Sequence, residues 1–146
     1  MYSHFFILVL IFVSTILNAT VICEPKTKYS NTFYVSPDGK DNWLKTQGSR
    51  LAPWRTINFA VSQIPDGSKL IVKPGIYKES IRFKRAFKKG ILILSEYNYQ
   101  AKLTNNQRIV AFSGLASNVT LSGFEITHTD EHASPLLIQI DGGGTD

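Results

Sequence analysis

From Lys69 onward the chain is a succession of short apolar runs, and no segment between them has the apolar spacing of a helix. Polar or glycine-containing turns separate the runs, which comprise residues 70–77, 80–83, 90–94, 108–112, 118–126 and 136–144. Short strands that follow one another without helices are typical of an all-β architecture. The connections are too irregular for a meander of tight hairpins, so an internal repeat is the alternative to test.

A shift of 28 residues brings the second half of the chain into register with itself. The matched positions are Ile91 with Val119, Ile93 with Leu121, Ile109 with Leu137, Val110 with Ile138, Phe112 with Ile140 and Gly114 with Gly142. A solenoid of parallel strands stacks like residues in this way, because each coil buries its inward face only against its own interior and its neighbours. The first coil, near residues 70–83, does not fit the shift, and two matching copies do not decide the repeat.

One short segment ahead of these runs has a helical period. Its apolar positions fall at helical spacing, Thr56 can cap its N-terminus, and residues 65–67 (Pro-Asp-Gly) end it; the apolar positions are Ile57, Ala60, Val61 and Ile64. Before it, residues 33–35 can form a strand and residues 37–39 a tight turn. Asp38 and Asp41 lack the alternating acidic positions of a calcium loop, so we interpret this stretch as a plain turn.

The first 23 residues contain no Lys, Arg, Asp or Glu, so the 16 basic and 11 acidic residues all lie in the remainder. Residues 5–17 have the length of a secretory apolar core, and small residues before position 24 suit cleavage. We therefore predict a signal peptide at 1–23, a polar leader at 24–32 and an extracellular protein. The alternative is an uncleaved anchor that retains the protein at the cell surface. Cleavage after Cys23 would leave no thiol for disulfides, catalysis or metal binding.

Residues 34–43 (YVSPDGKDNW) and 52–81 (APWRTINFAVSQIPDGSKLIVKPGIYKESI) resemble the N-terminal signature of secreted right-handed parallel β-helix proteins. This is the pectate-lyase-like superfamily, especially its exopolygalacturonate, alginate and chondroitin lyase-like branches. The resemblance implies a strand, turn and capping helix at 33–68, followed by the first coils of an all-β solenoid at 69–146. Members look much longer, so we expect an N-terminal fragment with two or three coils.

The same resemblance implies a lyase that removes a proton alpha to a carboxylate of an acidic polysaccharide such as pectate, alginate or chondroitin, with a Lys or Arg base and often Ca²⁺. A calcium site would need acidic residues in register on neighbouring coils. Shifting the late acidic residues by 28 gives only non-acidic partners: Glu125 to Tyr97, Asp130 to Lys102, Glu131 to Leu103, Asp141 to Ser113 and Asp146 to Asn118. We therefore predict no cofactor in this chain, assign no catalytic residue, and expect Ca²⁺ only in a full-length relative. The alternatives to a lyase are a non-catalytic binding or adhesion module and a non-functional fragment.

The densest charge in the chain lies in residues 78–90, where Phe83 and Phe87 sit among six cations and one acid. The cations are Lys78, Arg82, Lys84, Arg85, Lys88 and Lys89. Such a stretch can bind a polyanion, and export favours an acidic polysaccharide over nucleic acid. The alternative is a solvated loop whose Phe side chains pack inward. We expect no nucleic-acid partner, no membrane contact after signal cleavage, and a monomer.

Three smaller features have a structural alternative. His128 and His132 have a metal-like spacing, but they lie in a segment without helical pattern, so we favour a polar turn over a zinc site. Residues 118–120 form an N-glycosylation sequon, and Asn118 suits a turn equally well. Four aromatic residues are able to stack on sugar rings, although core packing is the commoner role; they are Trp43, Trp54, Tyr97 and Tyr99.

Overall fold

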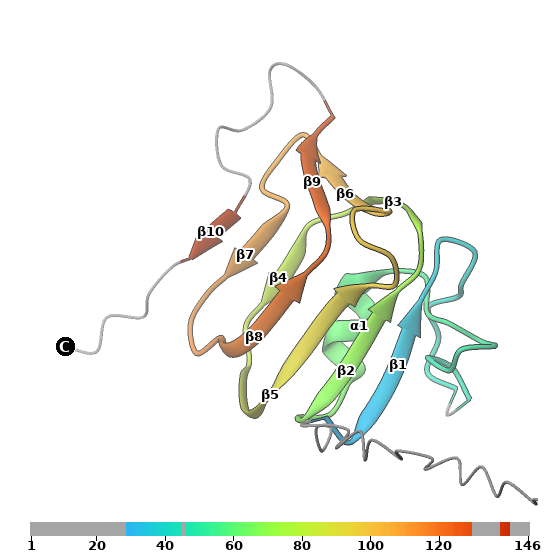
Figure 1. Ribbon diagram of the computed structural model, residues 1–146. Helices are drawn as coiled ribbons and strands as arrows, with labels where there is room; N and C mark the ends of the chain where they lie inside the picture. Colours follow the sequence, from blue (N-terminus) through green and yellow to red (C-terminus); the bar gives the residue numbers. More distant parts are fainter. Residues whose placement is uncertain (1–28, 45, 130–137, 141–146) are drawn as a thin grey trace, which may run out of the picture.

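The computed structural model describes residues 29–44, 46–129 and 138–140. This part of the chain is mostly β, with parallel sheets and one short helix, α1 (Ile57–Gln63), which confirms the predicted all-β class (Figure 1). The strands are β1 (Asn31–Val35), β2 (Ser68–Val72), β3 (Gly75–Lys78), β4 (Ile81–Phe83), β5 (Ala86–Ser95), β6 (Ala101–Asn105), β7 (Val110–Phe112), β8 (Ser117–Ser122), β9 (Glu125–His128) and β10 (Ile138–Ile140). The predicted signal peptide at 1–23 lies outside the described residues. No helix within the described ranges has the length and hydropathy to cross a membrane.

The strands belong to three sheets, and every pairing between them is parallel. The first sheet has the order β1-β2-β5-β8, the second β3-β6-β9 and the third β4-β7-β10. From β2 onward the chain visits the first, second and third sheets in turn and then returns to the first. Strands that are neighbours in a sheet are therefore separated by two strands of the other sheets.

The 28-residue register is confirmed for two of the three sheets. The paired residues are Ile91 with Val119 and Ile93 with Leu121 in the first sheet, and Val110 with Ile138 and Phe112 with Ile140 in the third. The other two predicted pairs involve Leu137 and Gly142, which lie outside the described residues. The inward-facing Ile91 and Ile93 are buried, as stacked apolar rows of parallel strands require.

The second sheet has a different register, which the sequence analysis did not foresee. Lys102 of β6 pairs with Glu125 of β9, a shift of 23 residues. The connection from β5 to β6 is five residues longer than that from β8 to β9, so a single shift cannot align all three sheets. β6 itself was missed, because its five residues contain only Ala101 and Leu103 as apolar positions, both of them buried.

The predicted buried face of the helix is confirmed, since Ile57, Ala60, Val61 and Ile64 all lie in the core. Thr56 caps the helix as expected: its Oγ1 accepts a hydrogen bond from the Phe59 N–H at 3.2 Å. In Figure 1 the helix lies behind β1 and β2.

The helix also covers an open sheet edge. β4 is the edge strand of the third sheet, and Asn58 Oδ1 of the helix accepts a hydrogen bond from the Arg82 N–H of β4 at 3.1 Å. An uncovered edge would leave this donor open to pairing with another chain.

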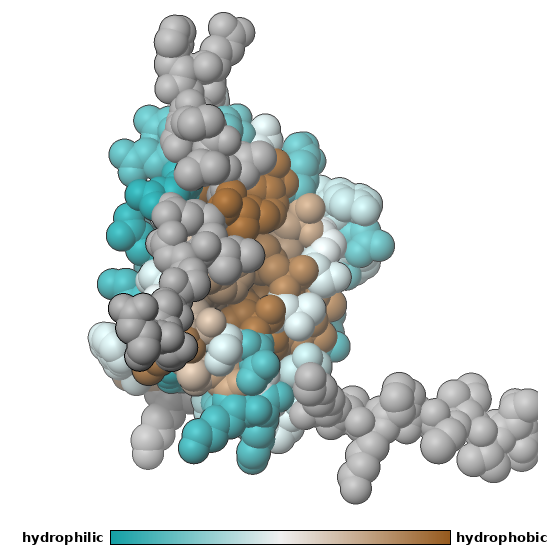
Figure 2. Space-filling view, turned by 90° about the vertical axis from the view of Figure 1, so that its left-hand side faces the viewer, coloured by the Kyte–Doolittle hydropathy of each residue, from teal (hydrophilic) through white to brown (hydrophobic). Residues whose placement is uncertain are grey.

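The last strands leave apolar side chains partly exposed. Figure 2 shows these side chains gathered at the centre of the face on which β8 and β10 lie. Val119, Leu121, Phe124 and Ile126 pack against the buried core but are only partly buried themselves. The apolar core thus narrows from fully buried residues at β2 and β5 to half-buried ones at β8 and β9.

Candidate functional site

The cationic segment at 78–90 spans β4 and the start of β5, and its side chains alternate between the core and solvent. Phe83 and Phe87 are each 1% exposed, whereas Arg82, Lys84 and Arg85 are exposed. The strand period of two explains this arrangement, because successive side chains point to opposite faces. The interpretation in which the Phe side chains pack inward and the cations face water is therefore confirmed.

Three of the six predicted cations line one groove. Arg82, Lys84 and Arg85 line an open groove of about 400 Å³ between α1 and β4, together with Asn58, Val61, Ser62, Phe83 and Phe87. Arg82 and Lys84 also line a neighbouring hollow of about 140 Å³, and here they are joined by Arg108 and Gln107. We call the exposed side chains of Arg82, Lys84, Arg85 and Arg108 the basic face.

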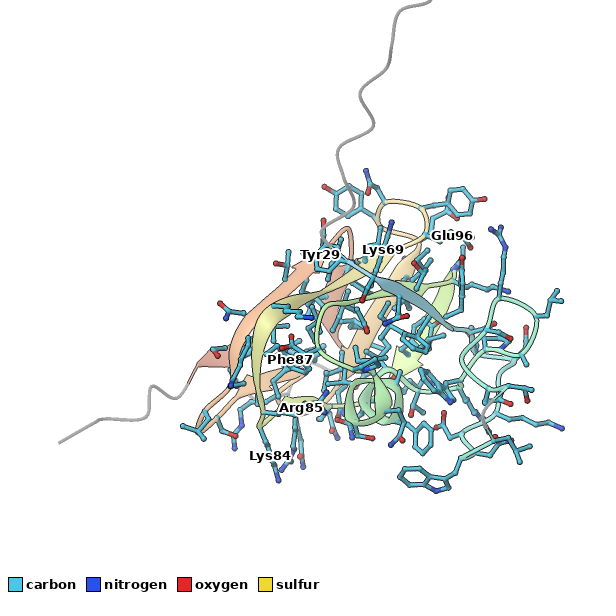
Figure 3. The ribbon with its side chains drawn as sticks, turned by 90° about the horizontal axis from the view of Figure 1, so that it is seen from below. Tyr29, Lys69, Lys84, Arg85, Phe87 and Glu96 are labelled. Carbon is cyan, nitrogen blue, oxygen red and sulfur yellow. The ribbon has the colours of Figure 1, made fainter. Side chains whose placement is uncertain are left out.

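Arg85 is the most firmly placed member of the basic face. Its Nη2 donates a hydrogen bond to the Ile64 carbonyl at 2.7 Å, at the C-terminal end of α1. Its guanidinium lies over the Phe87 ring, with Cζ 4.4 Å from the ring centroid. A cation at this end of a helix satisfies a free carbonyl and complements the helix dipole. Figure 3 shows Lys84 and Arg85 projecting from the same side of the molecule, with Phe87 behind them.

Arg108 belongs to the basic face although the sequence analysis did not select it. It lies 19 residues beyond Lys89, just before β7, and the pairing of β4 with β7 brings it beside Arg82 and Lys84. Within the described residues no carboxylate lies within 4 Å of these four cations. The basic face therefore presents positive charge without an acidic partner from the described chain.

The other three predicted cations lie elsewhere. Lys78 lines a separate hollow of about 530 Å³ in which Arg55 faces the acidic residues Asp41 and Glu79. Lys88 and Lys89 are exposed at the start of β5, and the Lys89 N–H donates to both carboxylate oxygens of Asp66 at 3.0 Å. The six cations that the sequence presents as one cluster are thus divided among three places.

Two carboxylates hold the start of α1. Asp41 accepts hydrogen bonds from the Arg55 N–H at 2.8 Å, the Thr56 N–H at 3.0 Å and the Thr56 hydroxyl at 2.7 Å. Glu79 accepts from the N–H groups of Ile57 at 2.9 Å and Asn58 at 2.8 Å. These carboxylates satisfy the free N–H groups of the first helical turn, so we assign to both a structural role.

The pKa of Glu79 reflects this position. Burial raises the pKa of the Glu79 carboxyl above its usual range, while the N–H groups of Asn58 and Ile57 oppose the rise and the negative charge of Asp41 adds to it. Burial likewise raises the pKa of the neighbouring Tyr77 hydroxyl, and the charges of Glu79 and Asp38 add to the effect.

The search for stacked acidic residues used one incorrect register. Glu125 lies beside Lys102 and not beside Tyr97, and Lys102 Nζ is 2.9 Å from Glu125 Oε2. The partner is still not acidic. Asp130, Glu131, Asp141 and Asp146 lie outside the described residues. In the described ranges no three His, Cys, Asp or Glu side chains gather as metal ligands would.

The remaining candidates divide between core and surface. Trp54 is buried and stacks on Phe33, so sugar stacking is wrong for this residue. Trp43 is exposed and meets the Phe59 ring edge-on, whereas Tyr97 and Tyr99 are exposed in the turn between β5 and β6.

Two polar candidates take part in hydrogen bonds with neighbouring strands. Asn118 has a φ of +56° and donates to the Phe87 carbonyl at 2.8 Å, which supports its interpretation as a turn residue. His128 Nδ1 lies 3.1 Å from the Asn105 carbonyl oxygen, and His132 lies outside the described residues.

Comparisons with protein-family models, with curated proteins and with solved structures give no match to this chain. The resemblance to the pectate-lyase-like superfamily therefore stays a prediction from the sequence.

Proposed function

We propose that the chain forms the first coils of a right-handed parallel β-helix and that its basic face binds an acidic polysaccharide outside the cell. The fold proposal is supported by the order of the strands, which visit three parallel sheets in turn and stack like residues in register. Burial of Ile57, Ala60, Val61 and Ile64 supports the capping role of α1. The resemblance at 34–43 and 52–81 supports the same superfamily.

The observation that carries the binding proposal is the unpartnered charge of Arg82, Lys84, Arg85 and Arg108 along one continuous surface. Guanidinium groups bind carboxylates through two parallel hydrogen bonds, and three of the four cations are Arg. Arg85 is already held by Ile64 and Phe87, so it loses little conformational freedom on binding. An open groove suits a chain that continues past the site in both directions.

We assign binding, and not cleavage, to these four residues. A β-elimination needs a base with a lowered pKa and a cation or metal that neutralises the substrate carboxylate. The basic face supplies cations for the second requirement, and the pKa shifts of the described acids and Tyr77 lie at Glu79, Tyr77 and Asp66, outside the basic face. The lyase activity that the resemblance implies thus stays a prediction for coils beyond those described.

A pair of double variants tests the binding site. Arg82→Gln with Lys84→Gln removes two charges from the basic face, and Lys78→Gln with Lys88→Gln removes two charges from the same segment outside it. We expect the first variant to bind polygalacturonate at least about fivefold more weakly than the protein does, because exposed ion pairs contribute roughly 0.2 to 1 kcal/mol each. The second variant should change affinity by less than about twofold.

Affinity is measured by titration calorimetry at low salt and again at higher salt, with neutral dextran as the control polymer. Binding should weaken with salt, since the contacts are exposed to solvent. Equal losses in the two double variants would show that net charge alone drives binding. No binding of polygalacturonate, alginate or chondroitin sulfate at low salt would refute the proposal.

A further inference from the structure

The turn between β5 and β6 presents two tyrosine rings to solvent. Tyr97 is 57% exposed and Tyr99 is 68% exposed, and they lie two residues apart in a turn of five residues, 96–100. An isolated exposed apolar side chain is normal on a protein surface. Two large aromatic residues in one short turn form a local patch that combines apolar ring faces with hydroxyl groups.

Tyr99 holds its position at a cost in backbone strain. Its φ is +64°, in the left-handed region that bulky side chains rarely adopt. Because the ring is mostly exposed, it buries little apolar surface that would offset this strain. Strained residues of this kind cluster at ligand sites, where the surrounding structure enforces them.

Hydrogen bonds fix the turn in this conformation. The Tyr99 N–H donates to the Gly123 carbonyl at 2.7 Å, which ties the turn to the segment between β8 and β9. The Ser95 hydroxyl donates to the Tyr97 carbonyl at 2.6 Å and accepts from the Ala101 N–H at 3.2 Å. The rings are thus carried on a rigid backbone, so little ordering is needed when a ligand binds.

Polar groups that suit sugar hydroxyls lie next to the rings. Glu96 precedes Tyr97, and Arg50 Nη2 lies 3.5 Å from Glu96 Oε1. Arg50 is itself exposed and lies over the Tyr34 ring, with Cζ 5.8 Å from the ring centroid. The carboxylate accepts and the guanidinium donates hydrogen bonds, and this pair of functions matches vicinal hydroxyl groups.

We infer that the turn at 96–100 is a second carbohydrate site, at which Tyr99 and Tyr97 stack on the apolar face of a pyranose ring and the Arg50–Glu96 pair binds its hydroxyls. A pyranose ring offers axial C–H groups to an aromatic face, whatever charge the sugar carries. Tyrosine supplies a rigid amphipathic contact area at low entropic cost.

The site does not depend on the basic face. Figure 3 shows Glu96 on the opposite side of the molecule from Lys84 and Arg85. The inference therefore goes beyond the proposed function, since it does not require an acidic ligand.

The test uses cellohexaose, a neutral oligosaccharide whose pyranose rings have all ring hydroxyls equatorial. Saturation-transfer NMR and titration on the protein are compared with those on Tyr99→Gly, Tyr99→Ala and Tyr97→Ala. We expect each variant to bind roughly fivefold more weakly. Leu115→Ala, which removes an 80% exposed side chain from another turn, is the matched control and should bind as the unchanged protein does.

Thermal unfolding separates a binding role from a structural one. Tyr99→Gly should unfold at a higher temperature than Tyr99→Ala, because glycine adopts the left-handed conformation freely, while both lose binding equally. Variants that unfold earlier yet bind cellohexaose normally would overturn the inference, and so would absence of saturation transfer from the unchanged protein. Polygalacturonate binding through the basic face should be unaffected by Tyr99→Gly, so the two proposals fail separately.

Discussion

The stack of Phe83 on Phe112 provides the sharpest test of the strand register. Phe83 is 1% exposed, and its ring is parallel to that of Phe112, with centroids 4.8 Å apart and planes at 13°. The two residues pair directly across β4 and β7. Phe83→Ala should cost about 3 to 5 kcal/mol of unfolding free energy, because it removes a fully buried ring from a core that cannot collapse around the cavity.

Phe83→Leu separates burial from ring contact. Leucine retains most of the apolar volume but loses the aromatic pair, so we expect a cost of about 1 to 1.5 kcal/mol. This variant also keeps the test valid if Phe83→Ala does not fold. A double-mutant cycle with Phe112→Leu should give a coupling energy of about 0.5 to 1.5 kcal/mol between the two rings.

The assay is urea unfolding followed by circular dichroism and by the fluorescence of the buried Trp54. Leu115→Ala is the control and should change the free energy of unfolding by less than about 0.5 kcal/mol. A cost below about 1 kcal/mol for Phe83→Ala, or a coupling energy of zero, would refute the stacked register of β4 and β7. Because Arg82 and Lys84 flank Phe83, loss of the ring should also weaken polygalacturonate binding.

Two further predictions concern single polar side chains. Desolvation alone raises the pKa of Asp66, but hydrogen bonds from backbone N–H groups at Lys89, Lys88, Gly67 and Gly90 together lower it, so its stabilising effect is present above the unfolded pKa of about 3.9 and is lost as the pH falls through the lower folded value. Asp66→Asn should therefore destabilise the protein at neutral pH, and a difference in urea midpoint that does not shrink in acid would contradict this reasoning. Asn118→Ala should cost about 1 to 2 kcal/mol more than Asn118→Gly, since only glycine adopts a φ of +56° without strain, and equal thermal midpoints for the two variants would count against that explanation.

Features that depend on local sequence were predicted well. The helix at 57–63 follows from the spacing of its apolar residues and from a capping Thr56, both of which act within one or two turns of the chain. Phe83 and Phe87 face the core because side chains alternate along a strand. The matches of β5 with β8 and of β7 with β10 were visible because those coils contain equal numbers of residues.

The candidate sites were predicted only in part. Arg82, Lys84 and Arg85 were selected from charge density, but nothing in the sequence separates them from Lys88 and Lys89, which lie elsewhere. Arg108 carries no local signal at all. A basic residue isolated along the chain becomes part of the basic face only when β7 pairs with β4.

The sequence by itself thus determined the all-β class, the single helix with its buried face, and the inward or outward direction of most strand residues, since these depend on periods of two and 3.6 residues. Tertiary structure alone decided the register of β6 with β9, the division of the cations and the strained turn at Tyr99. Each of these depends on connection lengths and on hydrogen bonds between coils, such as that from the Tyr99 N–H to the Gly123 carbonyl, which join residues more than twenty positions apart. Local periodicity contains no information about such distant partners.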